Sequence, residues 1–326
     1  MRILVLNAEQ VSAACRMRAC VDEMASVFAL VGDGKTESPL RTRLAVSDTR
    51  DILVMPSLVR RRGPEASLKV VSVIPDGGPG VPAIRAVVLL VDGRDGAAVA
   101  MLDGGALTGI RTGAVSGLSC RYLARKDSRT LGIVGAGVQA YYQVMGVCSQ
   151  LGIRHVKIFS KDVGLSSSLA KRCAREFSVR TTVAGSAAEC VRSSDVVVTA
   201  TTSTVPVFEG WDISAGTHVI AMGSYKPSNR EVDSTFVSRA TIFVDSRVAC
   251  LEEAGDLLIP IREGVLRRDP ISAELSELVK RKKTGRRRKE EITFFKSVGL
   301  AFEDNAAGWL AYRGAKARGI GKTIEL

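Results

Sequence analysis

The pattern of apolar and polar positions along the chain changes near residue 118. Before that point, short apolar runs separated by turn residues predict β-strands. Two stretches with helical spacing interrupt them, one from Val11 to Val31 and one that starts near Thr108. The expected strands are Ile52 to Met55, Leu68 to Ile74, Ala83 to Val91 and Ala97 to Leu102, and the expected turns are 76–80 and 92–96.

From Thr130 onward, strand-sized and helix-sized segments alternate. The expected strands are Thr130 to Val134, Val156 to Ser160, Asp195 to Ala200, Thr217 to Met222, Thr241 to Val244 and Ile292 to Phe295. The expected helices are Gln139 to Leu151, Leu165 to Phe177, Ile271 to Val279 and Leu300 to Arg318. This alternation predicts a parallel sheet with helices on both faces. We therefore predict an α/β protein with a Rossmann-like dinucleotide-binding domain over 119–299 and an α+β domain over 1–118 and 300–326.

The stretch from Leu131 to Ala140 carries the most informative motif. An apolar run ends in Gly135-x-Gly137-x-x-Ala140 and leads into a helix. In a dinucleotide-binding βα unit, the first glycine permits the tight turn and the second lets the backbone approach a pyrophosphate. The small third residue keeps the helix close to the strand. The helix N-terminus adds free N–H groups and a positive dipole. The residues expected to contact the cofactor here are Gly135, Ala136, Gly137, Val138 and Gln139.

The end of the second strand of this unit indicates which nicotinamide cofactor is used. An Asp or Glu there would bind the ribose 2′-hydroxyl and repel a 2′-phosphate. The strand instead ends in Ser160-Lys161, whose hydroxyl and cation suit a 2′-phosphate, although Asp162 lies beside them. We predict a preference for NADP(H), with NAD(H) as the alternative.

Composition limits the class of protein. The chain is 46% hydrophobic, which is enough for a core, and its longest apolar runs are strand-sized rather than membrane-spanning. Met1 to Leu6 lacks the features of a signal peptide, and the seven cysteines show no Cys-x-x-Cys spacing. We expect free thiols, a reducing compartment and a cytoplasmic location.

The net charge of +12 is concentrated in one run. Lys280 to Lys289 holds eight positive charges, which leaves +4 for the rest of the chain. Such a run could touch nucleic acid, but no aromatic residue interleaves with its charges. We expect a solvated loop, with nucleic-acid binding as the weaker alternative.

Three cations are the candidates for chemistry. Lys69 lies in a strand whose two faces both look buried, so it should meet an anion or take part in a reaction. The alternative is a strand-end lysine that reaches water. Arg111 shares a helical stripe with apolar residues, and Arg41 is a third candidate, although Arg43 fits as well. Together these cations would clamp a carboxylate.

The chain contains only two histidines. His155 starts a strand and His218 lies within another. We expect His155 to lie far from the active face and His218 to be a packed strand residue rather than a catalyst, and we expect no metal site.

Several stretches of the chain match one known family in order and number. They are Pro39–Arg43, Met55–Ser57, Leu68–Val71, Leu102–Gly104, Leu107–Thr112, the Gly135 turn, Ala221–Pro227, Arg230–Asp233 and Phe295–Leu300. Along nearly its whole length the chain resembles the ornithine cyclodeaminase/μ-crystallin family. The match is specific for the family but not for the substrate.

The resemblance implies a homodimer, in which the N-terminal domain and the C-terminal helix form a dimerisation and substrate domain. It also implies an active site in the cleft between this domain and the Rossmann-like one. The residues it places at the substrate are Arg41, Met55, Lys69, Arg111 and Tyr225, of which Arg41, Lys69 and Arg111 would be catalytic. Besides the glycine turn and the Ser160-Lys161 end, the residues it places near the cofactor are Thr112, Thr199, Ala200, Thr201, Met222, Gly223, Val298 and Gly299.

Members of the family differ in chemistry. Ornithine cyclodeaminases convert ornithine to proline and ammonia, others reduce cyclic ketimines, and still others are alanine dehydrogenases, opine-like synthases or, in μ-crystallin, binders of thyroid hormone. Cyclodeaminases carry an Asp two residues after the glycine that matches Gly223, to orient the distal amine, but here Tyr225 stands in its place. A cyclic imine has no distal ammonium and does not need that carboxylate.

We therefore predict an NAD(P)-dependent oxidoreductase acting on C–N bonds. It would reduce Δ1-pyrroline-2-carboxylate or Δ1-piperideine-2-carboxylate to L-proline or L-pipecolate. Arg41 and Arg111 would hold the carboxylate, while Lys69 would orient it or help supply the proton. The alternatives are an ornithine cyclodeaminase that uses Asp233 in place of the missing acid, and a non-catalytic binding protein.

Overall fold

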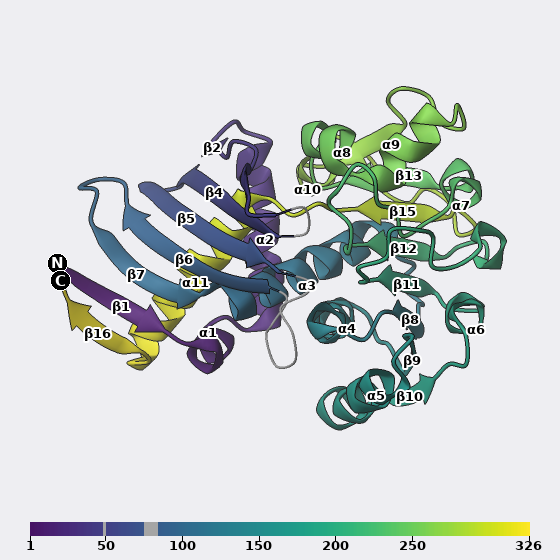
Figure 1. Cartoon of the computed structure of the whole chain (residues 1–326), viewed down its shortest axis with the longest axis horizontal. Coiled ribbons are helices and arrows are strands. Elements are labelled where there is room, and N and C mark those ends of the chain that lie inside the picture. The colour runs from purple at the N-terminus through teal and green to yellow at the C-terminus, as the bar shows by residue number, and fades with distance from the viewer. Residues whose placement is uncertain (48–49, 75–83) are drawn as a thin grey trace. The chain divides into compact units, whose positions relative to one another are not determined.

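The computed structural model describes residues 1–47, 50–74 and 84–326, which form two compact units (Figure 1). Unit 1 comprises residues 1–111 and 300–326, and unit 2 comprises 112–299. The chain first passes from unit 1 to unit 2 inside helix α3 (Gly104–Leu123), the helix in which the sequence placed the boundary at residue 118. The turn expected at 76–80 and the expected strand start at Ala83 lie outside the described residues.

Unit 1 is built on a mostly antiparallel sheet. Its strands are β1 (Arg2–Leu6), β2 (Thr36–Glu37), β3 (Thr42–Ala45), β4 (Asp51–Arg60), β5 (Pro64–Val73), β6 (Ile84–Asp92), β7 (Ala98–Asp103) and β16 (Lys322–Glu325). The order is β16-β1-β7-β6-β5-β4-β2, and β3 also pairs with β4. Asp92 and Gly96 close the hairpin between β6 and β7, where Gly96 has φ 76° and donates its N–H to the Asp92 carbonyl at 2.8 Å. The predicted hairpin turn at 92–96 is confirmed.

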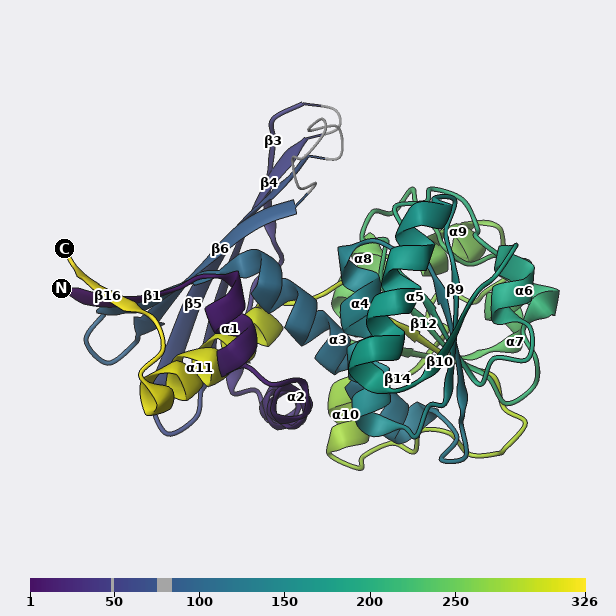
Figure 2. The same cartoon turned by 90° about the horizontal axis from the view of Figure 1, so that it is seen from below.

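Three helices cover one face of this sheet, α1 (Ala8–Ala14), α2 (Met17–Val31) and α11 (Ala301–Arg318), as Figure 2 shows. The C-terminal helix α11 packs on β4, β5 and β6, so the expected return of this helix to the first part of the chain is seen. The single helix expected over Val11 to Val31 is wrong. Cys15 and Arg16 adopt non-helical conformations with ψ of 81° and 139°, and the break lets α1 and α2 pack separately although the apolar spacing runs through it.

The opposite face of the sheet carries apolar side chains that unit 1 does not bury. One row of paired positions crosses four strands, Pro56, Leu68, Leu89 and Met101. Leu68 is 36% exposed, whereas Lys69, which points to the helix-covered face, is 2% exposed. The expectation that β5 is buried on both sides therefore fails for the single chain, because only one of its apolar faces is covered.

Unit 2 contains an entirely parallel sheet. Its strands are β8 (Thr130–Val134), β9 (His155–Phe159), β10 (Arg180–Val183), β11 (Val196–Thr199), β12 (His218–Ala221), β13 (Thr241–Val244), β14 (Ile271–Glu274) and β15 (Thr293–Lys296). The order is β10-β9-β8-β11-β12-β15-β13-β14. The direction of strand succession reverses between β8 and β11, which is the switch point where such sheets bind ligands.

Helices lie on both faces of this sheet, as predicted. They are α4 (Val138–Gln150), α5 (Val163–Phe177), α6 (Ala187–Val191), α7 (Ser234–Arg239), α8 (Arg247–Glu253), α9 (Gly255–Arg262), α10 (Leu275–Val279) and the 3₁₀ helix η1 (Gly210–Asp212). Figure 2 shows α4 and α5 on one face and α6 and α7 on the other. No helix in the described part of the chain is long and apolar enough to cross a membrane.

The helix expected over Ile271 to Val279 is half wrong. Residues 271–274 form strand β14, which pairs with β13 at the sheet edge, and only the rest is helical. The helix starts at Leu275 because Glu274 and Glu277 form a capping box. Pairing with β13 thus overrides the locally helical pattern of residues 271–274, and the capping box sets where the helix begins.

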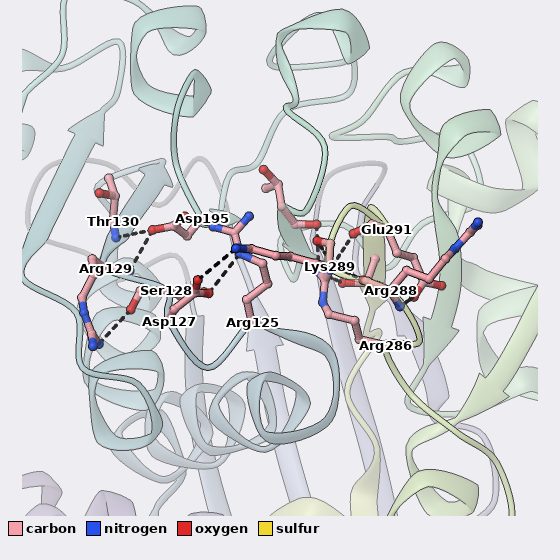
Figure 3. A network of polar contacts seen from close by, with 12 residues as sticks. Arg125, Asp127, Ser128, Arg129, Thr130, Asp195, Arg286, Arg288, Lys289 and Glu291 are labelled. Carbon is pink, nitrogen blue, oxygen red and sulfur yellow. Dashed lines mark hydrogen bonds and ion pairs between the residues drawn. The ribbon is translucent and has the colours of Figure 1, made fainter.

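The basic run Lys280 to Lys289 forms most of the loop between α10 and β15. Arg286 ties this loop down, because its Nε donates to the Leu123 carbonyl at 2.7 Å and its Nη2 to Thr293 Oγ1 at 2.9 Å. Figure 3 shows this arginine in one polar network with Asp195, which accepts from the backbone N–H groups of Arg129 and Thr130. The exposed cations of the loop are Arg281, Lys282, Lys283, Arg287, Arg288 and Lys289. The solvated loop is therefore confirmed for most of the run but is wrong for Arg286.

Candidate functional site

Two of the three candidate cations meet on one carboxylate inside unit 1. Lys69 of β5 places Nζ 3.0 Å from Asp304 Oδ1, and Arg111 of α3 places Nε 3.1 Å from the same oxygen. Arg111 Nη1 lies 2.6 Å from Glu303 Oε2. All four side chains are buried, and together we call them the charge cluster. Lys69 does not reach water, so the strand-end alternative is wrong.

Arg41 and Met55 lie close to this cluster. Met55 is buried on β4 and is the direct Cα partner of Lys69 across the strands. Arg41 is half-buried just before β3, and its charge acts on Lys69. Arg43 instead pairs with Asp51, Nε to Oδ1 at 2.7 Å, with half of its side chain exposed. The structure therefore favours Arg41 over Arg43 as the third cation.

Burial and charge act in opposite directions on these groups. Burial lowers the pKa of Lys69 to about 8, with Asp304 opposing it and Arg111 and Arg41 adding to it. Burial would raise the pKa of Asp304, but Arg111 and Lys69 outweigh it and hold that pKa below its usual value. Burial would lower the pKa of Arg111, yet its two carboxylates raise it. Of these three groups, the lysine alone is left with a proton that titrates near neutral pH.

In unit 2 the predicted cofactor residues follow the carboxyl ends of neighbouring parallel strands. Gly135 follows β8 with φ 106°, and a Cβ there would lie 2.5 Å from the Ala200 carbonyl oxygen. The other loops at this edge follow β9, β11, β12 and β15 and carry Ser160, Lys161, Ala200, Thr201, Met222, Gly223, Val298 and Gly299. Because parallel strands end at the same edge, the fold brings these residues to one side of the sheet.

One buried carboxylate joins two of these loops. Glu231 Oε1 accepts from both the N–H and the hydroxyl of Thr201 at 2.8 Å, and its Oε2 accepts from the Gly223 N–H at 2.7 Å. The Glu231 N–H in turn donates to Asp256, which pairs with the buried Lys296 at 2.8 Å. The loops after β11 and β12 are therefore held in a fixed arrangement.

A second carboxylate holds the loop after β15. Asp245 Oδ2 accepts from Ser297 Oγ at 2.7 Å, from the Val298 N–H at 2.9 Å and from the Gly299 N–H at 3.0 Å. Gly299 has φ 76°, which favours glycine at this position. The two residues expected beside the nicotinamide thus lie in a backbone turn built on one acid.

The loops at this edge fit a dinucleotide. Gly137 caps α4 without a side-chain hydrogen bond, and a Cβ added to it would meet no heavy atom within 4 Å. That open space lies at a helix N-terminus, where N–H groups and the helix dipole favour phosphate. Thr199 Oγ1 is buried at the end of β11 without a hydrogen-bond partner among the described residues. The remaining residues of the turn and helix start are Ala136, Val138 and Gln139, and Thr112 is buried in α3.

The strand end that selects the cofactor has its acid already engaged. Asp162 caps α5 by accepting from the Leu165 N–H at 2.9 Å, and Ser160 Oγ donates to the Asp162 carbonyl at 2.7 Å. Lys161 is exposed. The Asp162 carboxylate thus caps helix α5, while the Lys161 side chain is exposed to solvent.

The acid proposed to replace the missing cyclodeaminase carboxylate is also engaged. Asp233 caps α7, with Oδ1 accepting from the Phe236 N–H at 2.7 Å and Oδ2 from the Gly210 N–H at 2.8 Å. Tyr225 is half-buried in the loop after β12. Both oxygens of Asp233 serve the backbone, so the structure offers no support for its role as an ammonium acceptor.

His218 is a packing residue, as expected. His218 is fully buried, with hydrogen-bond contacts to Thr293 and Ser119, and burial lowers its pKa to about 3. His155 lies on the surface against Thr182 and Arg180. All seven cysteines lie in the described part of the chain as free thiols, and the side chains of residues 1–47, 50–74 and 84–326 form no cluster of metal ligands.

Sequence reasoning missed the acids that organise both units. They are Glu303 and Asp304 in unit 1 and Glu231, Asp245 and Asp256 in unit 2. A carboxylate in the first turn of a helix has an ordinary explanation in the helix dipole, so Glu303 and Asp304 gave no signal by themselves. The signal was present in the neighbouring residues, because the helix that begins at Ala301 is otherwise rich in small and apolar side chains.

Unit 2 has a Rossmann-like parallel sheet with a glycine turn at its switch point, and unit 1 has two buried cations, Lys69 and Arg111. These features define a dinucleotide-dependent enzyme with two domains. The family model described as "Ornithine cyclodeaminase/mu-crystallin family" matches residues 1–319. The chain belongs to this family.

Three similar proteins match this chain over nearly its full length. The chain is 35% identical to a Delta(1)-pyrroline-2-carboxylate reductase of Bacillus cereus, over 99% of this chain and 100% of that protein. A solved structure of Thermococcus litoralis Delta(1)-pyrroline-2-carboxylate reductase with NADH and L-proline has a TM-score of 0.96 and 36% identity, covering 99% of this chain and 100% of that one. An archaeal alanine dehydrogenase dimer with bound NAD has a TM-score of 0.92 and 29% identity, with both chains fully covered.

Two glycine substitutions separate folding from cofactor binding. Gly135→Ala should lower the free energy of unfolding by about 1–3 kcal/mol, because φ is positive and the Cβ meets the Ala200 carbonyl. Gly137→Ala should keep stability within about 1 kcal/mol, since its φ of −74° suits alanine and space is open, but should weaken NADPH binding. Urea unfolding and fluorescence titration measure the two effects. Equal losses of stability in both variants would contradict this assignment.

Proposed function

We propose that this protein reduces a cyclic ketimine carboxylate, with Δ1-pyrroline-2-carboxylate as the first substrate to test and L-proline as its product. The observation that carries the proposal is the convergence of Lys69 and Arg111 on Asp304. Two fixed cations suit a small carboxylate, and the relative of known structure at TM-score 0.96 holds NADH and L-proline.

The proposed roles follow from the chemistry of each group. Arg111 and Arg41 hold the substrate carboxylate through charge-assisted hydrogen bonds. Arg111 Nε and Nη1 already pair with Asp304 and Glu303, so Arg111 donates to the substrate from Nη2. Met55 lies opposite Lys69 and supplies an apolar wall for the ring carbons. The nicotinamide, when bound, supplies the hydride that the imine carbon accepts.

Lys69 is proposed to supply the proton. Reduction of an imine to an amine consumes one proton at nitrogen, and a general acid works best when its pKa is near the working pH. The pKa of Lys69 is lowered to about 8, so the group is mostly protonated at neutral pH and can still release its proton. A surface lysine would hold that proton too tightly to serve in this way.

Ornithine cyclodeamination is disfavoured because Asp233 is already engaged. A distal ammonium needs a carboxylate partner, and Asp233 already accepts two backbone N–H groups. The alternative of a non-catalytic binding protein predicts tight cofactor binding without turnover. Both alternatives are outcomes of the assay below.

The test is NADPH oxidation with Δ1-pyrroline-2-carboxylate and Δ1-piperideine-2-carboxylate, beside a search for proline and ammonia from L-ornithine. The proposal expects turnover with at least one cyclic imine and none with ornithine. Turnover of ornithine alone would overturn it in favour of a cyclodeaminase. Cofactor binding without any turnover would favour a binding protein.

We propose NADP(H) as the preferred cofactor, with NAD(H) also bound. Lys161 follows the strand end at which such folds bind the ribose 2′ group, and Asp162 is used as a helix cap. Two similar solved structures hold NADH and NAD, which supports NAD(H) as the second cofactor.

We also propose that the protein is a homodimer in a reducing, cytoplasmic compartment. The uncovered apolar row at Leu68, Leu89 and Met101 suits a second copy of the sheet, and a similar chain is described as a dimer. Seven free thiols suit a reducing environment.

Lys69 should control the alkaline side of the rate profile. The value of kcat/KM should stay level below pH 8 and fall about tenfold per pH unit above it, because the lysine loses its proton there. Lys69→Met should lose about a hundredfold or more in kcat while NADPH binding persists. Stopped-flow rates and a binding titration check both statements. A Lys69→Met enzyme with the wild-type rate would exclude the assigned role.

Cofactor preference should depend on Lys161. The wild type should give a higher kcat/KM with NADPH than with NADH, and Lys161→Asp should reverse the order because a carboxylate repels the 2′-phosphate. Lys171→Asp, an exposed lysine further along α5, is the matched control and should leave the ratio unchanged. A wild-type preference for NADH above about tenfold, or 1.4 kcal/mol, would rule the prediction out.

The uncovered sheet face should carry the dimer. Wild-type protein should elute with about twice the 34.7 kDa chain mass in light-scattering chromatography. Met101→Asp should shift it towards a monomer because a charge then lies in the apolar row. Val248→Asp, at an exposed position in α8, is the control and should remain dimeric. A monomeric wild type would contradict the proposal.

A further inference from the structure

We propose that Asp304 is a positioning residue, which rests on the proposed function and adds one group to it. A single oxygen, Oδ1, lies 3.0 Å from Lys69 Nζ and 3.1 Å from Arg111 Nε. Asp304 therefore fixes the proton donor relative to the cation that holds the substrate carboxylate. The two cations come from different elements, β5 and α3, and this acid pairs with both.

The position of Asp304 along the sheet is fixed by its neighbours on α11. Asn305 Nδ2 donates to the carbonyls of Glu65 at 2.9 Å and Ser57 at 3.3 Å, and Trp309 Nε1 donates to the Ala66 carbonyl at 3.2 Å. These three bonds tie the helix to the backbone of β4 and β5. The carboxylate is thus set against Lys69 by the same strand that carries the lysine.

The charges around Lys69 explain why an acid is needed at this point. Asp304 faces it from α11, Arg111 from α3 and Arg41 from the segment before β3. Burial and both arginines favour loss of the lysine proton, and Asp304 is the group that opposes them. Glu303 pairs with Arg111 at 2.6 Å instead. Removing the charge of Asp304 should therefore act on Lys69 more strongly than removing that of Glu303.

Asp304 uses only one of its carboxylate oxygens to pair with both cations. Its Oδ2 is buried and has no hydrogen-bond partner among the described residues. The hydrogen bonds from the two cations both go to Oδ1. An isosteric amide can still accept at that oxygen but cannot supply the charge.

The first experiment is the pH profile of kcat/KM for Asp304→Asn, with NADPH and Δ1-pyrroline-2-carboxylate. The alkaline limb should move to lower pH by about one unit or more, because an opposite charge at this distance shifts a pKa by that amount. Glu303→Gln is the matched comparison, and its limb should move less, because Glu303 pairs with Arg111 and not with Lys69. A wild-type limb and rate in Asp304→Asn would overturn the proposal, as would equal shifts in both variants.

A second variant covers the case in which Asp304→Asn does not fold. Asp304→Glu keeps the charge but moves the carboxylate by one methylene. The proposal expects the alkaline limb to stay in place while kcat falls at least about tenfold and KM changes less, because the proton donor is displaced. Wild-type kcat in this variant would show that the position of the acid does not matter.

A third readout does not depend on turnover. In protein labelled with [ε-¹³C]lysine, the signal lost in Lys69→Arg identifies Lys69, and its titration should move to lower pH in Asp304→Asn by more than in Glu303→Gln. No difference between the two variants would overturn the proposal. If the wild type turns over no cyclic imine and this difference is still present, the proposed function fails while the link between Asp304 and Lys69 stands.

Discussion

The buried pairing of Lys69 and Arg111 with Asp304 is the interaction on which the architecture of unit 1 depends. Two cations and two carboxylates lie out of water at separations between 2.6 and 3.1 Å. Burying any of these charges alone would cost several kcal/mol, and the oppositely charged neighbours offset that cost. The charge cluster is therefore a constraint on the fold of unit 1 as well as a candidate site, because strand β5 and helices α3 and α11 must meet around it.

Unit 2 solves a comparable problem with backbone groups. Glu231 and Asp245 accept six N–H or hydroxyl groups from loops that follow three strands. Loops at the end of a parallel sheet carry backbone donors that helices do not satisfy, and a buried acid can satisfy several at once. Asp256 extends this arrangement, because it accepts from the Glu231 N–H group and pairs with the buried Lys296. The residues expected around the nicotinamide are thus held by carboxylates that make no proposed contact with it.

The spacing of apolar residues along the chain predicted the strands whose positions depend on neighbouring residues alone. Strands β8 and β13 were expected at their observed ends, because buried parallel strands are short, continuous apolar runs between turn residues. Lys69 stood out because a charge in such a run is rare. Strand β14 depends on pairing with β13, and Asp304 lies 235 residues from the lysine that it pairs with. Such partners cannot be read from one neighbourhood of the chain.

Family membership fixes the reaction class more closely than the substrate. The fold recurs in solved structures described as a Delta(1)-pyrroline-2-carboxylate reductase and as an alanine dehydrogenase, so the substrate depends on side chains carried by a shared fold. The most direct measurement is a crystal structure of the protein grown with reduced cofactor and L-proline. We expect the proline carboxylate within hydrogen-bond distance of Arg111 and its ring nitrogen facing Lys69. Proline bound away from both residues, with the charge cluster unchanged, would show that the cluster is not the substrate site.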